Sequence, residues 1–343
     1  MRKYSTIFPT WGSTPRRIFY INFFNHMRNP FEKHNSGETS SEVSGKEVMR
    51  RQLEHPSQID LYEGGTMDAV DVKPEEMKTK TPAVWLRGWG TTGEVHEDNI
   101  LELAARGRRT LAVGTPHGID AANIPESATE QGREIHDIEL RKVAALLKML
   151  DEKEIQQTDV VAHSEGAIYG VYAALLRPER FRNMVLVDPA GMVGEDTQGR
   201  LVKGAALDLA LQTARIYKKL LTKEGFAAFK QSNTATKALA EVFASNPKST
   251  VESVGVIAQS QIDELLEVLR ELGIKISIIH GVDDNFFPME KVQKQTTTKM
   301  VDGFYSVQGT HNQLYLHPET YTALVDNALD ALEALRKKED DLK

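Results

Sequence analysis

The sequence predicts an α/β protein built on a doubly wound, mostly parallel sheet into which a helical cap is inserted. Three observations lead to this fold class. Short apolar segments alternate with helical ones from about residue 59 onward, which is typical of a parallel sheet covered on both faces. One interval of about 70 residues breaks the alternation and has helical periodicity only. Polar, reactive side chains follow several apolar segments, at the edge where such sheets bind ligands.

Composition and charge narrow the class of protein. The 343-residue chain has a formal net charge of −7, which argues against nucleic acid or an anionic membrane as the main partner. It contains no cysteine, which excludes disulfides, thiolate nucleophiles and cysteine-based metal sites. No apolar run has the length of a membrane span. Arg16-Arg17 and the apolar residues 18–21 resemble a twin-arginine export signal, but Asn22 and Asn25 interrupt it. We therefore expect a cytoplasmic protein, with export as the alternative.

The chain divides into three predicted regions. Residues 1–45 combine aromatic residues with Pro, Asn and His and then become polar, so we expect an accessory N-terminal arm and linker. This arm would pack either on its own domain or on a second subunit, and the second case would give a homodimer. Residues 46–190 and 261–343 are predicted to form the core, and residues 191–260 the helical cap inserted in it.

The core elements follow from apolar patterning. Leu61–Val72 contains two glycines in a β-rich composition, which indicates an opening hairpin. The other predicted strands are residues 83–86, 110–113, 159–162, 184–187, 274–279 and 300–307. Helical spacing predicts helices over residues 95–106 and 127–150, and another that ends at residue 176.

The interval between residues 191 and 260 contains helical runs at 201–221, 226–230 and 234–244. Connections of this length are usually functional, so we interpret it as a cap over a site, with an additional packing layer as the alternative. Its apolar residues suggest that an acyl chain or small apolar group is covered: Leu209, Leu211, Phe226, Phe229 and Phe243.

The segment Thr158–Ala167 carries the strongest chemical motif. It is an apolar strand that ends at Ser164 and is followed at once by a helix. This is the layout of the nucleophile elbow G-x-S-x-G, with Ala162 at the first glycine position. A serine hydroxyl attacks well only when a base removes its proton, and histidine has the appropriate pKa. His311 follows the last predicted strand, and an acidic loop at 283–284 follows the strand before it.

With this order of serine, acid and histidine, residues from about 60 to 337 resemble an α/β-hydrolase fold protein whose helical cap follows the sixth strand. The resemblance implies that Ser164 is the nucleophile and His311 the general base. The family's acid loop has the pattern Gly, two residues, Asp, three residues, Pro, which fits residues 281–288 and implies Asp284 as the acid. Its neighbour Asp283, and Asp188 after the preceding strand, are the alternatives.

The tetrahedral intermediate of acyl transfer needs backbone donors directed at its oxyanion. The elbow supplies the N–H of Glu165, and the resemblance implies the N–H of Trp89 as the second donor. Trp89, Glu165 and His117 are also candidate substrate-binding residues. The Glu165 carboxylate would either lie in a polar pocket, paired with a base such as Arg87, or bind a substrate amine and act as a second acid or base. His163 is expected to pack beneath the elbow.

The leading functional hypothesis is a metal-free serine hydrolase that cleaves a carboxylic ester or lactone through an acyl-enzyme on Ser164. The sequence has no HExxH motif or histidine-rich run, so no metal or cofactor is predicted. The predicted partner is a small-molecule ester or lactone. Other chemistries of the same fold remain open: C–C or thioester hydrolysis, acyl transfer and cofactor-free haloperoxidase activity. The alternative from a different class is a non-catalytic ligand-binding protein.

Overall fold

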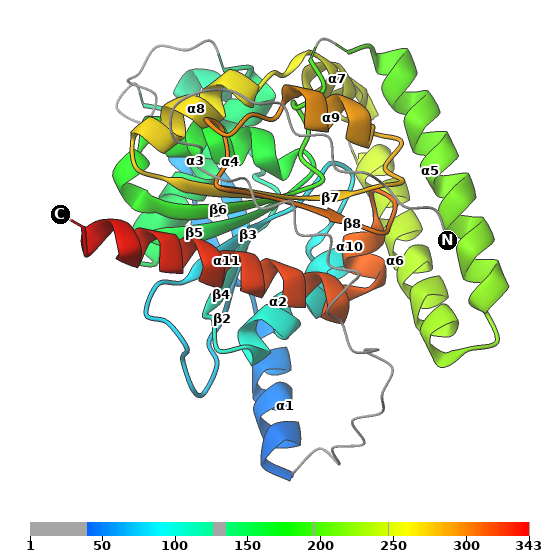
Figure 1. The fold of residues 1–343 in the computed structure, drawn as a ribbon, viewed down its shortest axis with the longest axis horizontal. Helices are drawn as coiled ribbons and strands as arrows, with labels where there is room; N and C mark the ends of the chain where they lie inside the picture. Colours follow the sequence, from blue (N-terminus) through cyan, green and yellow to red (C-terminus); the bar gives the residue numbers. More distant parts are fainter. Residues whose placement is uncertain (1–39, 126–134, 195, 246, 343) are drawn as a thin grey trace.

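The computed structural model describes residues 40–125, 135–194, 196–245 and 247–342. Its centre is an eight-stranded sheet with the strand order β1-β2-β4-β3-β5-β6-β7-β8. Helices cover both faces of this sheet, and a group of further helices stands at one end of the strands (Figure 1). The predicted fold class is thereby confirmed. The proposed arm lies outside the described residues, except that the end of the expected linker, residues 40–45, belongs to a helix.

The sheet opens with the predicted hairpin. β1 (Ser57–Asp60) pairs antiparallel with β2 (Thr66–Val72), which in turn pairs antiparallel with β4 (Thr110–Val113). The hairpin begins four residues earlier than the sequence suggested, because β1 alternates between exposed and buried residues and carries little apolar signal.

The remaining strands pair parallel to one another. Because their carboxyl ends lie at one edge, the loops that follow them meet there. The last strand begins at residue 303 rather than 300, since residues 298–300 form a turn. The strands are β3 (Ala83–Leu86), β5 (Thr158–His163), β6 (Phe181–Val187), β7 (Lys275–Gly281) and β8 (Gly303–Val307).

Two layers of helices enclose the sheet, each with its own buried apolar cluster. One face is covered by α3 (Asp137–Glu152), α4 (Gly166–Leu176) and α8 (Asp263–Glu271), and the other by α1 (Ser40–Glu54), α2 (Glu97–Ala105) and α11 (Pro318–Asp340) (Figure 1). The helix expected from residue 127 is described from residue 137. Short helices complete the core: α9 (Met289–Gln295), α10 (Gln313–Leu316), and the 3-10 turns Tyr62–Gly64, Gly93–His96, Ala121–Asn123 and Pro178–Arg180.

Three helices form the helical insert, which we define as residues 198–259. They are α5 (Gln198–Lys219), α6 (Lys223–Ser245) and α7 (Pro247–Gln259). The runs predicted separately at 226–230 and 234–244 are parts of the single helix α6. This helix contacts α10 and the 3-10 turn at 93–96, while α7 contacts α3. The insert therefore lies against loops at the carboxyl edge of the sheet. None of the helices within the described ranges combines the length and apolarity needed to cross a membrane.

Candidate active site

The turn after β5 holds Ser164 in a strained conformation. Its φ is +55°, in the left-handed region that non-glycine residues rarely adopt. The Ser164 N–H donates to the Val187 carbonyl at 3.0 Å. Close packing explains Gly166, because an added Cβ there would lie 2.6 Å from the Leu86 carbonyl oxygen. Ala162 is fully buried within β5, so the sheet accommodates the methyl group that replaces the usual glycine. This is the geometry of a nucleophile elbow.

Three buried side chains from three different loops form a hydrogen-bonded chain. The Ser164 Oγ lies 2.9 Å from His311 Nε2, and His311 Nδ1 lies 2.9 Å from the Asp284 carboxylate. The Phe287 N–H donates to the other oxygen of Asp284 at 2.9 Å. With Nδ1–H donating to Asp284, Nε2 is the nitrogen that can accept a proton from the Ser164 hydroxyl. The structure thus brings together the residues that the sequence singled out as nucleophile, base and acid.

The two alternative acids have other partners. The half-exposed Asp283 accepts from Arg215 at 2.8 Å and from Gln308 at 2.5 Å. Asp188 is fully buried and accepts from the Gly281 N–H at 2.7 Å. Burial, followed by the nearby Asp284 carboxylate, raises the pKa of Asp188 well above its usual range. Neither carboxylate hydrogen-bonds to His311, so the geometry favours Asp284.

Burial shifts the pKa of both members of the acid–base pair. It raises the pKa of Asp284 to about 6 and lowers the pKa of His311 to about 4. Because the two groups share a hydrogen bond, they titrate as a pair rather than independently. The state competent for catalysis has Asp284 ionised and His311 neutral. The raised pKa of Asp284 limits that state to above about pH 6, where His311 is already neutral.

If this pair serves as acid and base toward an ester, kcat/KM should rise with pH through the acidic range and be level above about pH 6. Acid removes activity because protonation of the pair discharges Asp284 or occupies the Nε2 of His311. The measurement is the initial rate of phenyl acetate hydrolysis between pH 4 and 8, with product quantified chromatographically. Fluorescence at each pH should show that the protein stays folded. A midpoint above 7 would contradict this account of the pair.

The two candidate oxyanion donors belong to segments that adjoin Ser164: Glu165 follows it in the chain, and Trp89 follows Gly88. Gly88 packs against the nucleophile so closely that an added Cβ would lie 2.9 Å from the Ser164 Cβ. Within the described residues, the backbone N–H groups of Trp89 and Glu165 donate to no protein acceptor. The helical insert fixes the Trp89 side chain, whose indole N–H donates to the Thr250 carbonyl at 3.2 Å and whose ring packs edge-on against Phe243. Both N–H groups are therefore available to a ligand.

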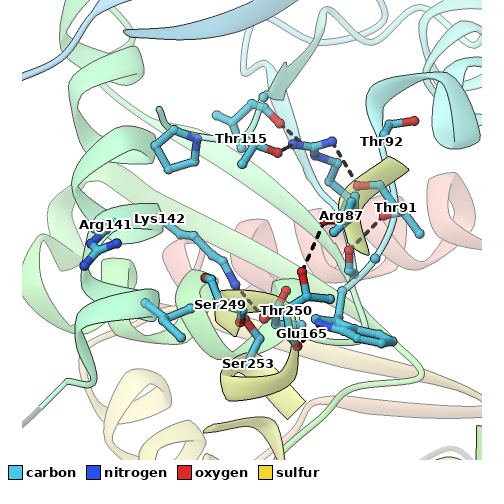
Figure 2. Close-up of a pocket in the computed structure, with 18 of the residues that line it drawn as sticks. Arg87, Thr91, Thr92, Thr115, Arg141, Lys142, Glu165, Ser249, Thr250 and Ser253 are labelled. Carbon is cyan, nitrogen blue, oxygen red and sulfur yellow. Dashed lines mark hydrogen bonds and ion pairs between the residues drawn. The ribbon is translucent and has the colours of Figure 1, made fainter. Parts of the chain in front are cut away.

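The Glu165 carboxylate pairs with a base that the sequence analysis did not identify. Lys142 of α3 lies 2.5 Å from Glu165 (Figure 2). It also lies 3.3 Å from Glu139. Burial raises the pKa of Glu139 to about 8, so the Glu139 carboxyl is largely protonated at neutral pH. Glu165 thus lines a polar pocket and pairs with a base, but this base is Lys142 and not Arg87. The guanidinium of Arg87 instead donates to the Val113 and Thr91 carbonyls and the Thr115 hydroxyl.

Glu139 could have been recognised from the helical pattern. Glu139 stands four residues before Val143 and seven before Leu146, on the stripe of α3 that faces the core. A charged side chain on an apolar stripe needs a partner, since burial of an unpaired charge is costly. The sequence pattern predicts the helix, but it does not show that Lys142, the partner of Glu139, also contacts Glu165 of the elbow.

Replacing Lys142 with methionine is expected to lower the free energy of unfolding by about 2–3 kcal/mol, because Glu165 keeps a buried and uncompensated charge. Urea unfolding measures the difference. Lys148→Met is the matched control on the same helix, since its ion pair with Glu152 is more exposed and is expected to contribute less than about 1 kcal/mol. Equal unfolding midpoints for the two variants would show that Lys142 does not compensate a buried charge.

A cavity of about 540 Å³ lies next to the elbow. Gly88 and Glu165, which flank Ser164, form part of its wall, and the exposed His117 lies at its margin. Its other walls come from α3, α6 and α7. Figure 2 shows Lys142 reaching toward Glu165 from α3, opposite the hydroxyl-bearing residues of α7. Most of its polar lining residues are hydroxyl-bearing or charged: Thr91, Thr92, Thr115, Arg141, Glu241, Ser245, Ser249, Thr250 and Ser253.

This lining differs from the apolar surface expected of the helical insert. Leu209, Leu211 and Phe226 are 53%, 41% and 63% exposed, and none of them lines the cavity. Phe243 instead packs on Trp89. The helices of the insert direct much of their polar surface inward, so apolar content alone could not indicate which side faces the site.

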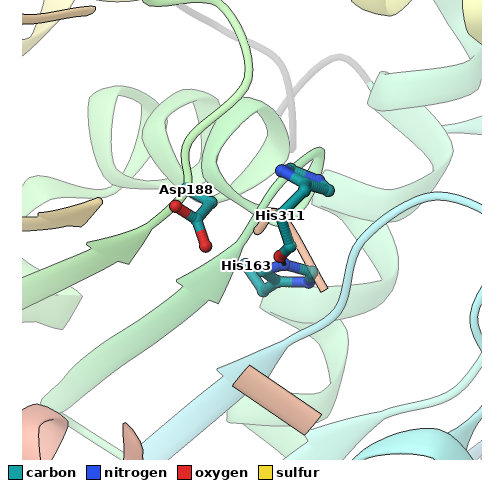
Figure 3. A group of neighbouring side chains, drawn as sticks. All are labelled: His163, Asp188 and His311. Atoms are coloured by element: carbon teal, nitrogen blue, oxygen red, sulfur yellow. Dashed lines mark hydrogen bonds between the residues drawn. The ribbon is translucent and has the colours of Figure 1, made fainter. Parts of the chain in front are cut away.

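A second group of buried side chains lies beneath the triad. Ring or carboxylate atoms of His163, Asp188 and His311 lie within 4.8 Å of one another (Figure 3), and Asp188, His280 and Asp284 form a similar group. His163 Nε2 lies 3.0 Å from the His311 carbonyl oxygen, and burial lowers the pKa of His163 to about 3. His163 is thus a neutral, buried residue under the elbow, as expected. Both ring nitrogens of His311 already contact Ser164 and Asp284. We therefore interpret the neighbouring buried side chains of His163, Asp188 and His280 as packing that supports the triad.

The sequence and fold now identify the class of protein. A family profile described as alpha/beta hydrolase fold matches residues 114–318, and the chain belongs to this family. A protein of Mycobacterium phage D29 with the provisional name non-heme haloperoxidase is 26% identical over 270 residues, covering 76% of this chain and 92% of that protein. The family assignment supports a hydrolase as the class of enzyme.

Solved structures share the fold at low sequence identity. A serine hydrolase from Cycloclasticus zankles matches with a TM-score of 0.57 and 17% identity, over 81% of this chain and 98% of that one. A meta-cleavage product hydrolase from Pseudomonas fluorescens IP01 matches with a TM-score of 0.55 and 17% identity, over 81% of this chain and 99% of that one. A bromoperoxidase from Bacillus anthracis matches with a TM-score of 0.54 and 15% identity, over 80% of this chain and 100% of that one.

Proposed function

We propose that this protein is a metal-free serine hydrolase that cleaves a carboxylic ester or lactone through an acyl-enzyme on Ser164. The observation that carries the proposal is the hydrogen-bonded order Ser164, His311, Asp284 on a strained elbow. A binding protein has no need of a serine, a histidine and an acid bonded in this order, whereas acyl transfer uses all three.

The proposed reaction has two steps. His311 Nε2 accepts the proton of Ser164 as its Oγ attacks the carbonyl carbon, and the imidazolium then protonates the departing alkoxide. Water subsequently attacks the acyl carbon while His311 takes its proton, and the return of that proton to Ser164 Oγ releases the carboxylic acid. The ionised Asp284 holds Nδ1–H in place and stabilises the imidazolium in both steps.

The proposed oxyanion donors are the N–H groups of Trp89 and Glu165. They are unpaired within the described part of the chain and flank the nucleophile. The Glu165 N–H also lies at the N-terminus of α4, where the helix dipole favours negative charge. Each such donor typically accelerates the chemical step by about 10²–10³-fold.

The cavity argues for a small substrate with polar groups. Its hydroxyl-bearing and charged lining offers hydrogen bonds, which a long alkyl chain cannot make. Because Lys142 already neutralises Glu165, that carboxylate is a poor site for a substrate amine. In this proposal the helical insert, within residues 191–260, is the cap, and residues 46–190 and 261–343 are the catalytic core.

The similarity to the phage protein favours a second candidate activity, halide oxidation without heme. It would use the same serine, with hydrogen peroxide instead of water attacking the acyl-enzyme to give a peracid that oxidises the halide. The test is bromination of monochlorodimedone by the protein with bromide, hydrogen peroxide and a carboxylic acid. Bromination that needs both the peroxide and the acid would support this second activity, and its absence would favour hydrolysis alone.

The proposal is tested with a panel of short and long p-nitrophenyl esters, lactones and thioesters. We expect turnover of the short esters or lactones, with longer alkyl chains converted more slowly. Hydrolysis of thioesters or C–C bonds alone would overturn the ester and lactone assignment. Lack of turnover across the panel, with no reaction toward a fluorophosphonate probe, would favour the ligand-binding alternative.

A further inference from the structure

One face of α5 lies along the two loops that carry the triad's acid and base. Gly204, Asp208, Gln212 and Arg215 recur at helical spacing and all approach these loops. An added Cβ at Gly204 would collide with the Asn285 carbonyl oxygen, which shows how closely the helix approaches the acid loop. Gln212 accepts from the Asn312 side chain at 3.3 Å, and Arg215 donates to Asp283 at 2.8 Å.

Asp208 joins the two loops directly. One carboxylate oxygen accepts from the backbone N–H of Asn285 at 2.9 Å and from its side-chain amide at 3.0 Å. The other oxygen accepts from the backbone N–H of His311 at 2.8 Å. The side chain is fully buried. A single carboxylate from the helical insert thus fixes the residue after the acid and the base itself.

We propose that Asp208 is a positioning residue that holds the Asp284 and His311 loops in register and stabilises the imidazolium form of His311 by its negative charge. The proposal rests on the proposed function, because it assigns Asp208 a role in the same serine hydrolase site. It also means that the insert does more than cover the cavity. Its first helix completes the support of the triad.

The chemistry of the three donors requires a carboxylate. All three groups that contact Asp208 are N–H donors, and they approach from both sides. An asparagine offers one carbonyl oxygen, and its own amide group would face the N–H on the other side. The isosteric Asp208→Asn change therefore preserves shape while it removes the charge and one set of hydrogen bonds.

The charge has a defined effect on His311. Burial lowers the pKa of His311, and the Asp208 carboxylate acts in the opposite direction. The titratable groups near the ring also include Asp284, the buried Asp188, the neutral His163 and the buried His280, whose pKa burial lowers. Two arginines of the same helix lie at the acid loop: Arg200 pairs with Asp196 and donates to the Asn285 and Phe286 carbonyls, and Arg215 pairs with Asp283. Asp208 is thus, with Asp284, one of two carboxylates whose charge favours the imidazolium.

The experiment compares wild type, Asp208→Asn and Asp208→Glu by the rate of fluorophosphonate labelling and by phenyl acetate kinetics from pH 4 to 8. For Asp208→Asn we expect the labelling rate and kcat to fall about tenfold with little change in KM. The midpoint of the rise of kcat/KM with pH, which we call the acidic limb, should move down by about one pH unit. The Glu variant keeps the charge, so its limb should stay near the wild-type position.

Asp302→Asn is the matched control. That carboxylate also accepts a backbone N–H, from Ile276 at 2.9 Å, but it lies at the opposite end of β7. Its loss should lower the melting temperature without moving the pH profile. If Asp208→Asn also loses only stability, with a wild-type rate per folded molecule and an unmoved limb, the proposal is overturned.

A readout that does not depend on activity separates this proposal from the proposed function. NMR titration of the His311 ring should give a lower midpoint in Asp208→Asn than in wild type, even if neither protein labels. An unchanged midpoint overturns the role of Asp208, whereas a wild type that fails to label overturns the hydrolase proposal. If Asp208→Asn does not fold, Asn285→Ala removes one donor and should slow labelling about threefold. An unchanged rate there counts against the proposal.

Discussion

Ser164→Ala is expected to lower kcat for ester hydrolysis by five to six orders of magnitude, about the loss seen when a catalytic-triad serine is removed elsewhere. The effect is large because no other described nucleophile lies 2.9 Å from His311 Nε2. Folding should be unaffected, since the change deletes one oxygen and the backbone strain at φ +55° remains. Initial rates with phenyl acetate, together with the melting temperature, check both statements.

The control for this variant is Ser260→Ala. Ser260 directly follows the helical insert and is also buried, and its hydroxyl donates to the Val256 carbonyl at 2.7 Å. It should keep its activity within about twofold. If Ser164→Ala retains more than a tenth of wild-type turnover, another residue is the nucleophile and the elbow has a structural role only.

Asp284→Asn is expected to reduce kcat by about 10⁴-fold, because an amide in place of the carboxylate disfavours the Nδ1–H tautomer and leaves the imidazolium without its counter-charge. Asp283→Asn should reduce kcat by less than about threefold, since that side chain contacts Arg215 and Gln308 instead. Kinetics on the two variants side by side give the measurement, and circular dichroism should show that both are folded. A larger loss at Asp283 would reverse the assignment of the acid.

The fold could be predicted because its strands are short apolar runs between helices. Strands with every residue buried, such as β3 and β5, gave an unambiguous pattern. β1 alternates between exposed and buried residues and begins earlier than its weak apolar signal predicts. The start of α1, residues 40–45, lies in the segment whose polar composition predicts a linker. In both cases local composition was a weaker signal than the tertiary packing that decides the structure.

The site was predictable to the extent that its residues follow strand ends. Ser164, His311 and the acid loop could be recognised because parallel strands bring such loops to one edge. The contacts of Lys142 and Asp208 could not, since each depends on how one helix lies against a loop distant in sequence. The same reason explains the polar cavity, because residues from five segments of the chain converge on it.

The central claim is that Ser164 is an activated nucleophile. Its most direct test is to incubate the folded protein with a fluorophosphonate at pH 7.5, measure the intact mass and map the adduct by peptide sequencing. The account predicts one adduct per chain, on Ser164, that is absent from Ser164→Ala and slowed in Asp284→Asn. An unlabelled protein under conditions that label a known esterase, or an adduct on another residue, would contradict it.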